Sequence, residues 1–196
     1  MVGRSFLSVP EAAEQRRSIR KYTAAPIPDD ELREIIRLAG RAPSAWNLQP
    51  WRFVVVQDPA LKAQLRVAAN NQPQVTAAPA VIVLYSDMDD VLAHLDDVVA
   101  PTMKQRITAF FDAKSPADRA AWGHGLAYIA LGYLVLVAES RGYATSPMLG
   151  FKADEVKKLL GLPESATVAA IVALGAPDEA GVASRRHPVD RVASFR

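Results

Sequence analysis

Residues 42–56 are the most informative segment of this 196-residue chain. They read Ala42-Pro43-Ser44-Ala45-Trp46-Asn47-Leu48-Gln49-Pro50-Trp51-Arg52-Phe53-Val54-Val55-Val56. Prolines fix φ, so residues 41–51 predict a stiff, irregular loop, and the β-branched run Phe53–Val56 predicts a strand after it. The loop also combines two tryptophans with Ser44 and Asn47, which suits the wall of a site for a planar ligand. An ordinary helix–strand connection is the alternative interpretation.

The remaining elements favour an α+β fold in one domain, residues 1–196. Helices are predicted at Val9–Arg16 (with Ser8 and Glu11 as a capping box), 29–40, Leu61–Ala69, Pro116–Arg141 and Ala153–Leu160. Strands are predicted at Ala80–Tyr85, Tyr143–Ser146 and Ala166–Leu174. Residues 87–120 resemble a mobile helical insert, and no periodicity remains after Pro177. Helices come first and strands later, which suits a sheet flanked by helices better than repeating βαβ units.

The helix predicted at Pro116–Arg141 is the most hydrophobic part of the chain. From Gly125 to Ala138 it has apolar residues on every side, which predicts a fully buried helix. This uncharged run is shorter than the ~20 residues that a membrane-spanning helix needs. No signal-peptide pattern begins the sequence, so we expect a soluble, cytoplasmic protein with no membrane partner.

Basic residues are concentrated at two places although the formal net charge is only +2. Residues 16–21 and 185–196 together hold eight basic residues and one acidic residue, which leaves the rest of the chain net acidic. In an extended segment Arg16, Ser18 and Arg20 alternate onto one side, where guanidinium groups and a hydroxyl can converge on a phosphate. A solvated basic patch at a helix end is the other interpretation.

Several kinds of chemistry are excluded by composition. The chain has no cysteine, which excludes a thiolate nucleophile, a zinc–thiolate site and an iron–sulfur cluster. Its three histidines lie far apart in sequence, so we expect no metal site. Phosphate-loop, dinucleotide-binding, zinc-protease and nucleophile-elbow motifs do not occur. An enzyme with this sequence would take its chemistry from a bound cofactor.

A third candidate ligand segment is Ser146–Phe151, where Gly150 permits close approach to the backbone.

Six segments together resemble the FMN-dependent nitroreductase family. They are Arg16-Arg17-Ser18-Ile19-Arg20 before a proline-rich turn, Ala42–Phe53, Pro147–Phe151, Leu159–Pro163, Val172–Pro177 and Arg185-Arg186-x-Pro188. Each match is modest alone, but all occur in the family's order from residue 16 to residue 188.

The resemblance implies an α+β fold with a mainly antiparallel sheet, an intertwined homodimer, and FMN at the dimer interface. Arg16, Arg17, Ser18 and Arg20 would hold the phosphate and ribityl chain, and Arg186 with Arg185 would return from the tail to the same phosphate. Pro43, Ser44 and Asn47 of the other subunit would line the flavin. Leu149 and Gly150 would present backbone N–H groups to its O4/N5 edge, and Asn71 would bind its pyrimidine side. Gln74 replaces a lysine found in some members, which leaves less positive charge beside the flavin N1–C2=O.

By the same resemblance, NAD(P)H would reduce the flavin, and a nitroaromatic, quinone or similar small molecule would then take the reducing equivalents in ping-pong order. No side chain is predicted to be catalytic. Trp46, Trp122, His124, Phe110 and Phe111 are the candidates for the substrate side. A non-catalytic flavin or nucleotide-binding module is the main alternative. A nucleic-acid-binding protein is disfavoured by the net acidic body and the lack of a recognition motif.

Overall fold

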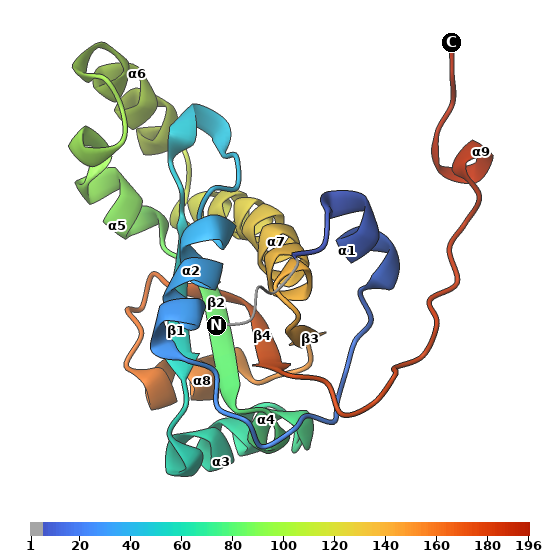
Figure 1. Cartoon of the computed structure of the whole chain (residues 1–196). Coiled ribbons are helices and arrows are strands. Elements are labelled where there is room, and N and C mark those ends of the chain that lie inside the picture. Colours follow the sequence, from blue (N-terminus) through green and yellow to red (C-terminus); the bar gives the residue numbers. More distant parts are fainter. Residues whose placement is uncertain (1–5) are drawn as a thin grey trace.

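The computed structural model describes residues 6–196 (Figure 1). In this part of the chain four strands form one antiparallel sheet in the order β1-β2-β4-β3. The strands are β1 (Trp51–Val56), β2 (Ala80–Ser86), β3 (Ala144–Met148) and β4 (Thr167–Gly175). The predicted antiparallel α+β architecture is therefore confirmed. Because β1 and β3 are the outer strands, segments attached to them lie at opposite edges of the sheet.

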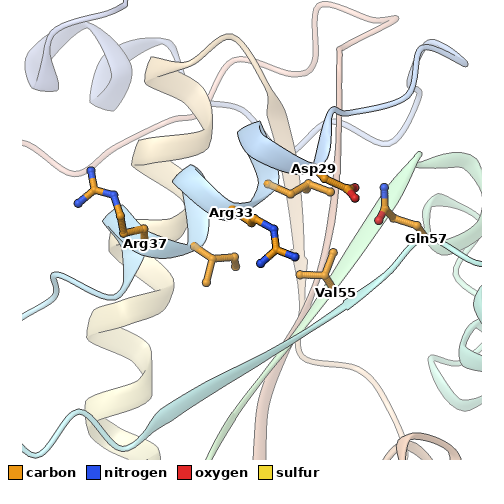
Figure 2. A pocket seen from close by; sticks show the side chains of 7 residues that line it. Asp29, Arg33, Arg37, Val55 and Gln57 are labelled. Carbon is orange, nitrogen blue, oxygen red and sulfur yellow. The ribbon is translucent and has the colours of Figure 1, made fainter.

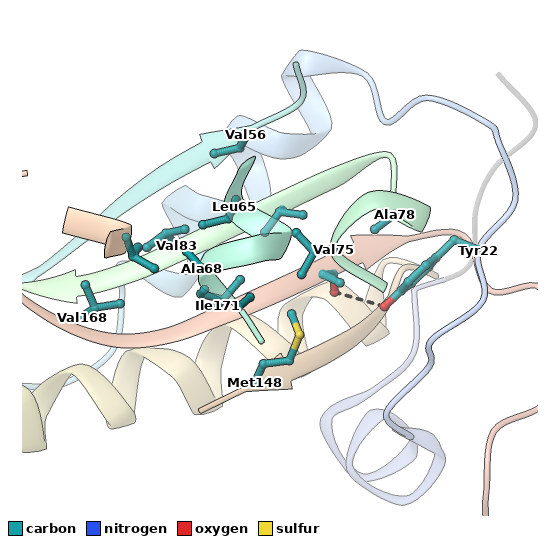
Figure 3. Close-up of a cluster of buried hydrophobic side chains, with 14 of the residues drawn as sticks. Tyr22, Val56, Leu65, Ala68, Val75, Ala78, Val83, Met148, Val168 and Ile171 are labelled. Carbon is teal, nitrogen blue, oxygen red and sulfur yellow. Dashed lines mark hydrogen bonds between the residues drawn. The ribbon is translucent and has the colours of Figure 1, made fainter. Parts of the chain in front are cut away.

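The two central strands bury both of their faces. Val81 and Val83 of β2 point to one side together with their β4 partners, and Ile82 points to the other. Helices α3 (Pro59–Ala68), α4 (Gln74–Ala77) and α8 (Ala153–Leu160) cover the first side, where the cluster of Figure 3 lies. Helices α2 (Asp29–Ala39) and α7 (Pro116–Ser140) cover the second side. The period of two along a strand thus produces a three-layer structure.

Helix α7 is not fully buried, which corrects the expectation for Gly125–Ala138. Ala127, Ala130, Leu134 and Ala138 face the core, whereas Tyr128, Ile129 and Tyr133 are between 38% and 41% exposed. A helix of 3.6 residues per turn can turn only one face toward a sheet. By length and composition α7 could cross a membrane, but in this fold one side of it packs against the sheet and α2. Its opposite side, with these three residues, is an apolar surface that the described residues leave partly open to solvent.

A helical insert at residues 88–112 forms a separate layer beside β1, as the sequence predicts for part of 87–120. It comprises α5 (Met88–Ala93), η2 (Leu95–Asp97) and α6 (Pro101–Asp112) (Figure 1). Its apolar side chains form their own cluster with Leu48 of the 41–51 loop, distinct from the clusters on the sheet. The insert is therefore packed mainly against that loop and the start of α7.

The chain leaves the body after β4. Ala176 and Pro177 pair with residues 22–23, and beyond Gly181 the C-terminal arm (residues 182–196) extends away from the sheet (Figure 1). Its only regular element is the short helix α9 (Val189–Val192), and Val182 and Phe195 are more than 80% exposed. The arm carries four arginines beside these exposed apolar side chains, and it packs on nothing within the described chain.

Most element boundaries agree with the sequence to within two residues. Helix α1 (Val9–Gln15) begins with the predicted capping box, in which Ser8 and Glu11 exchange hydrogen bonds. Three short helical turns were not predicted: α4, α9 in the C-terminal arm, and η1 (Ala45–Asn47) inside the 41–51 loop. Each is a single turn, too short to produce a helical period in the sequence.

Candidate functional site

The Arg16–Arg20 segment lies along the free edge of β3. Ser18 forms a parallel bridge with Thr145, and the Ile19 N–H donates to the Thr145 carbonyl at 3.0 Å. Ile19 is buried, and Arg20 is exposed. Because side chains alternate along an extended segment, burial of Ile19 turns its two neighbours outward. Backbone pairing thus presents the basic segment at the sheet edge.

This end of the site has unpartnered polar atoms. Arg16 Nη1 and Thr145 Oγ1 are buried and have no hydrogen-bond partner within residues 6–196. Arg17 Nη1 instead donates to the carbonyls of Glu14 (2.6 Å) and Arg16 (2.9 Å), at the end of α1. Unpartnered buried donors are uncommon in proteins, and beside a basic segment they suit an anion.

Two carboxylates adjoin the basic segment. Burial raises the pKa of Glu139 on α7, and the charges of Arg16 and Arg17 oppose that rise. Glu179 accepts hydrogen bonds from the backbone N–H groups of Arg20 (2.6 Å) and Lys21 (3.3 Å). These hydrogen bonds hold the pKa of Glu179 below its ordinary value. The Glu179 carboxylate therefore anchors the root of the C-terminal arm to the basic segment.

The opposite end of β3 carries Leu149 and Gly150, both exposed. Gln72 Nε2 donates to the Gly150 carbonyl at 2.9 Å, and a Cβ atom built on Gly150 would lie 3.5 Å from Asn70 Nδ2. At ~3.3 Å per residue, Thr145 and Gly150 are roughly 16 Å apart along the chain. We call the edge from Arg16 through Thr145 to Gly150 the β3 strip.

Asn70 and Gln72 are residues at this end that the sequence did not single out. Both asparagines are exposed, but Asn70 lies beside Gly150, whereas the backbone of Asn71 is tied to Arg66. Both asparagines have left-handed φ angles, 54° and 58°. A pair of asparagines before Gln72 was the available signal, because asparagine tolerates this conformation. Gln74 is buried and donates to Gln72 Oε1, so it supports the side chain that holds Gly150.

Pro43, Ser44 and Asn47 are not part of the β3 strip. Their loop precedes β1, at the other edge of the sheet, and three strand spacings of ~4.8 Å separate the two edges. The single chain therefore divides the predicted ligand residues between two places.

The aromatic substrate-side candidates gather next to this loop. Trp46 and Trp122 stack with ring centroids 6.2 Å apart, and Phe110 and Phe111 pack edge-on against Trp46. Phe111 is fully buried, while Phe110 is 40% exposed. His124 lies apart, with its ring against Tyr128 and its Nδ1 unpartnered in the described chain. Four of the five candidates thus form one cluster, in which Phe111 packs rather than faces solvent.

Arg185 and Arg186 are exposed on the C-terminal arm, outside the β3 strip. Arg186 Nη1 donates to the carbonyl of Arg185 at 3.1 Å, and no hydrogen bond from either residue to the Arg16–Arg20 segment is found among residues 6–196. We predicted that these arginines lie beside the Arg16–Arg20 segment, and within one chain they do not.

A groove runs along the free edge of β1 (Figure 2). It has a volume of about 580 Å³ and is lined by Leu32, Ile36 and Val55, with Arg33 and Arg37 at its sides. A second hollow of about 420 Å³ continues it along β1 to Trp51. The groove is separate from the β3 strip, and an edge strand lies open within it.

Comparison with known proteins agrees with this architecture. The model of the nitroreductase family matches residues 13–176. A Thermus thermophilus protein named NADH dehydrogenase is 50% identical over 97% of both chains, and a Bacillus subtilis protein described as an NAD(P)H nitroreductase, YdgI, is 32% identical over 95% of this chain and 96% of its own. An Exiguobacterium sibiricum structure described as a nitroreductase in complex with FMN superposes with a TM-score of 0.87 at 27% identity, covering 98% of this chain and 99% of its own. The chain belongs to the nitroreductase family.

Proposed function

We propose that the protein is an FMN-dependent oxidoreductase that takes hydride from NAD(P)H and passes it to a small organic acceptor such as a nitroaromatic or a quinone. The observation that carries this proposal is the β3 strip. One end presents cationic side chains and unpartnered donors, and the other presents an exposed glycine flanked by amide side chains. The FMN bound in the Exiguobacterium sibiricum structure supports the same choice of ligand.

The residues of the strip fit this cofactor. Arg16, Ser18 and Arg20 would hold the phosphate, because guanidinium groups bind phosphate in bidentate geometry. Thr145 Oγ1, buried and unpartnered, would gain a partner. Gly150 exposes backbone where a side chain would otherwise cover it, and Asn70 supplies an amide beside it. Asn71 remains our candidate for the pyrimidine side of the ring.

Bound FMN would supply the hydride chemistry, so the protein needs no acid–base side chain of its own. The arginines fix the cofactor through its phosphate, and the N–H groups of Leu149 and Gly150 orient the ring. Trp46 and the exposed Phe110 offer flat apolar surface to a planar acceptor. We propose that donor and acceptor use the same face in turn, in ping-pong order.

A homodimer would bring the two halves of the site together. The Ser44–Asn47 loop of one subunit would face the β3 strip of the other, which no single chain can achieve with the two at opposite sheet edges. The exposed apolar side of α7, with Tyr128, Ile129 and Tyr133, supplies a surface for this contact. Surfaces of this kind commonly mark protein–protein interfaces.

The C-terminal arm would complete the intertwined dimer. Its 15 residues can extend up to ~50 Å, far enough to cross onto a partner. Its last residues, with Val192 and Phe195 exposed, would pair with the free edge of β1 in the partner's groove. Arg185 and Arg186 would then approach a phosphate that the two subunits share. We propose that this dimer works in the cytoplasm, without membrane or nucleic-acid partners.

Anaerobic reduction of the purified protein tests the proposal. Flavin absorbance should be present at about one FMN per chain, NADH or NADPH should bleach it, and a panel of nitroaromatics and quinones should restore it. A protein that stays colourless after incubation with FMN overturns the proposal. A yellow protein that neither nucleotide reduces supports the non-catalytic flavin module instead.

A double variant tests the phosphate assignment. Arg20→Ala with Arg186→Ala should release FMN and leave an apoprotein with unchanged far-UV circular dichroism. Lys158→Ala, which removes an exposed cation on α8, is the matched control and should keep its flavin. Full FMN occupancy in the double variant would contradict the role of these arginines.

A further inference from the structure

The 41–51 loop adopts a conformation that its residues do not favour. Trp46, Asn47 and Gln49 have φ angles of 52°, 58° and 46°, in the left-handed region. Asparagine tolerates that region, but tryptophan and glutamine do not. Such residues persist where surrounding contacts hold them, and they are concentrated at ligand sites. The contacts around this loop are therefore needed to hold its left-handed residues.

Hydrogen bonds within the loop converge on Gln49. Its backbone N–H donates to Ser44 Oγ at 2.9 Å, and its side-chain Nε2 donates to the Asn47 carbonyl at 3.1 Å. Its carbonyl accepts from Arg52 Nη1 at 3.0 Å. Arg52 is thus the side chain outside the loop that holds its most strained end.

Arg52 also ties the loop to the helical insert. Its Nε donates to Asp90 Oδ2 on α5 at 3.1 Å, Nη2 contacts the same oxygen, and Nη1 donates to the Trp51 carbonyl at 2.8 Å. On its other side Asp90 Oδ1 lies 3.2 Å from His94 Nδ1. The guanidinium therefore connects two backbone carbonyls near the loop end to one carboxylate of the insert.

Apolar contacts join the same two parts. Leu48 is buried among Met88, Val91, Leu95, Ile107 and Phe111 of the insert. Trp46 packs edge-on against Phe110 and Phe111, and Asn47 Nδ2 reaches the Val98 carbonyl at 3.5 Å. The middle of the loop is consequently packed on the insert, whereas Ala42 and Trp51 at its two ends pack against the sheet and α7.

An isolated surface ion pair contributes little to stability, and Arg52 and Asp90 are each more than a third exposed. Here the same guanidinium also satisfies backbone carbonyls, one of them on the left-handed Gln49. Loss of the carboxylate would free the guanidinium to leave those carbonyls, and the loop would relax toward ordinary φ angles. The effect would then appear at Ser44 and Asn47, not in overall stability.

We propose that Arg52, held by Asp90, is a positioning residue that locks the ligand-side loop to the helical insert in its ligand-competent conformation. This inference rests on the proposed function, in which Ser44 and Asn47 line the flavin of the partner subunit. The loop and the insert then behave as one unit, and a change in the insert alters flavin binding without touching the flavin.

The test compares Arg52→Gln, Asp90→Asn and the double variant, with Glu155→Gln as control. Glu155 forms an ion pair with Lys152 that is more exposed than the Arg52–Asp90 pair and remote from the loop. FMN dissociation constants are measured by flavin fluorescence on the apoproteins. We expect Asp90→Asn to weaken FMN binding about tenfold, and the double variant to be no weaker than Arg52→Gln alone. Glu155→Gln should bind like the wild type.

Asp90→Asn separates positioning from charge. It removes a negative charge, so electrostatics alone would leave the binding of anionic FMN unchanged or tighter, and either result overturns the proposal. A second measurement needs no flavin: the circular dichroism of the stacked Trp46–Trp122 pair should change in Asp90→Asn apoprotein and not in Glu155→Gln. If the wild type binds no FMN, the proposed function fails, and an unchanged tryptophan signal would then reject the positioning role as well.

Discussion

The β3 strip and the 41–51 loop carry the two halves of the proposed site, and the fold holds them in different ways. The strip is attached by backbone pairing: Ser18 and Ile19 pair with Thr145 on a strand of the sheet. The middle of the loop is attached mainly by side chains, through Arg52 on Asp90 and through Leu48 in the separate apolar cluster of the insert, which we call the satellite cluster. One half inherits the rigidity of the sheet, and the other depends on the insert.

This difference has a consequence for local stability. Residues paired to a strand of the sheet are protected by it, whereas a loop on the satellite cluster can open without the sheet. The strip can therefore keep its geometry while the loop moves. Three substitutions test whether the two regions respond independently, and we expect the first to have the strongest effect and the last the weakest.

Phe111→Ala should have the largest effect, and the effect should be confined to one region. Phe111 is fully buried in the satellite cluster, so its truncation should cost about 3–5 kcal/mol of local stability. Hydrogen exchange should accelerate in residues 88–112 and in the loop, while β2 and β4 stay protected. Phe110→Ala is the matched control, and should cost about 1 kcal/mol because that ring is 40% exposed. Equal loss of protection in the sheet would show that the two regions are one cooperative unit.

Gly181→Ala should disturb the strip through the root of the arm. Gly181 has a φ of +70°, and a Cβ there would lie 2.7 Å from Ile19 Cδ1 and 2.9 Å from Arg17 Cβ. We expect about 1–3 kcal/mol of destabilisation in urea, together with weaker FMN binding. Gly142→Ala has a similar φ of +80° with nothing within 4 Å, so it isolates the backbone strain. Identical behaviour of the two variants would show that the contact between the arm root and the strip contributes neither to stability nor to FMN binding.

Glu139→Gln should have the smallest effect and should depend on pH. Burial raises the pKa of Glu139 in the folded protein above its ordinary value of 4.5, so the wild type loses stability as pH rises through the folded-state pKa. The glutamine variant lacks that loss. Its melting temperature relative to wild type should rise from pH 4 to pH 7 by a few degrees, about 1–3 °C. A difference independent of pH would mean that Glu139 titrates normally.

Local patterns predicted the elements well because each element satisfies local rules. The capping box at Ser8, the strand after the 41–51 loop and helix α8 all appear close to their predicted limits. Composition also singled out the Arg16–Arg20 run and the segments that contain Asn47 and Gly150 as candidate ligand segments, and their role stays a prediction. Asn70, Arg52 and Asp90 were not singled out, because their contacts are with residues distant in sequence. Asn70 lies beside Gly150, and Arg52 pairs with Asp90.

The apolar helix shows where local reasoning fails. Hydrophobicity on every side of Gly125–Ala138 predicted full burial, yet the chain covers only one side and leaves Tyr128 and Tyr133 exposed. Hydrophobicity in a sequence predicts that a surface is buried, but it does not indicate whether the same chain or another copy buries it. For the same reason, the positions of Arg185 and Arg186 could not be derived from one chain.

The sequence by itself determined the helices and strands of an α+β fold, because these follow from periodicity and turn residues, and its ordered motifs carried the resemblance that implied the family and the antiparallel sheet. The tertiary structure alone decided that Arg16 and Gly150 lie at two ends of one strand edge while Ser44 and Asn47 lie at the opposite edge. The strand order β1-β2-β4-β3 produces that separation. Strand order depends on how distant segments pack, and no local pattern encodes it.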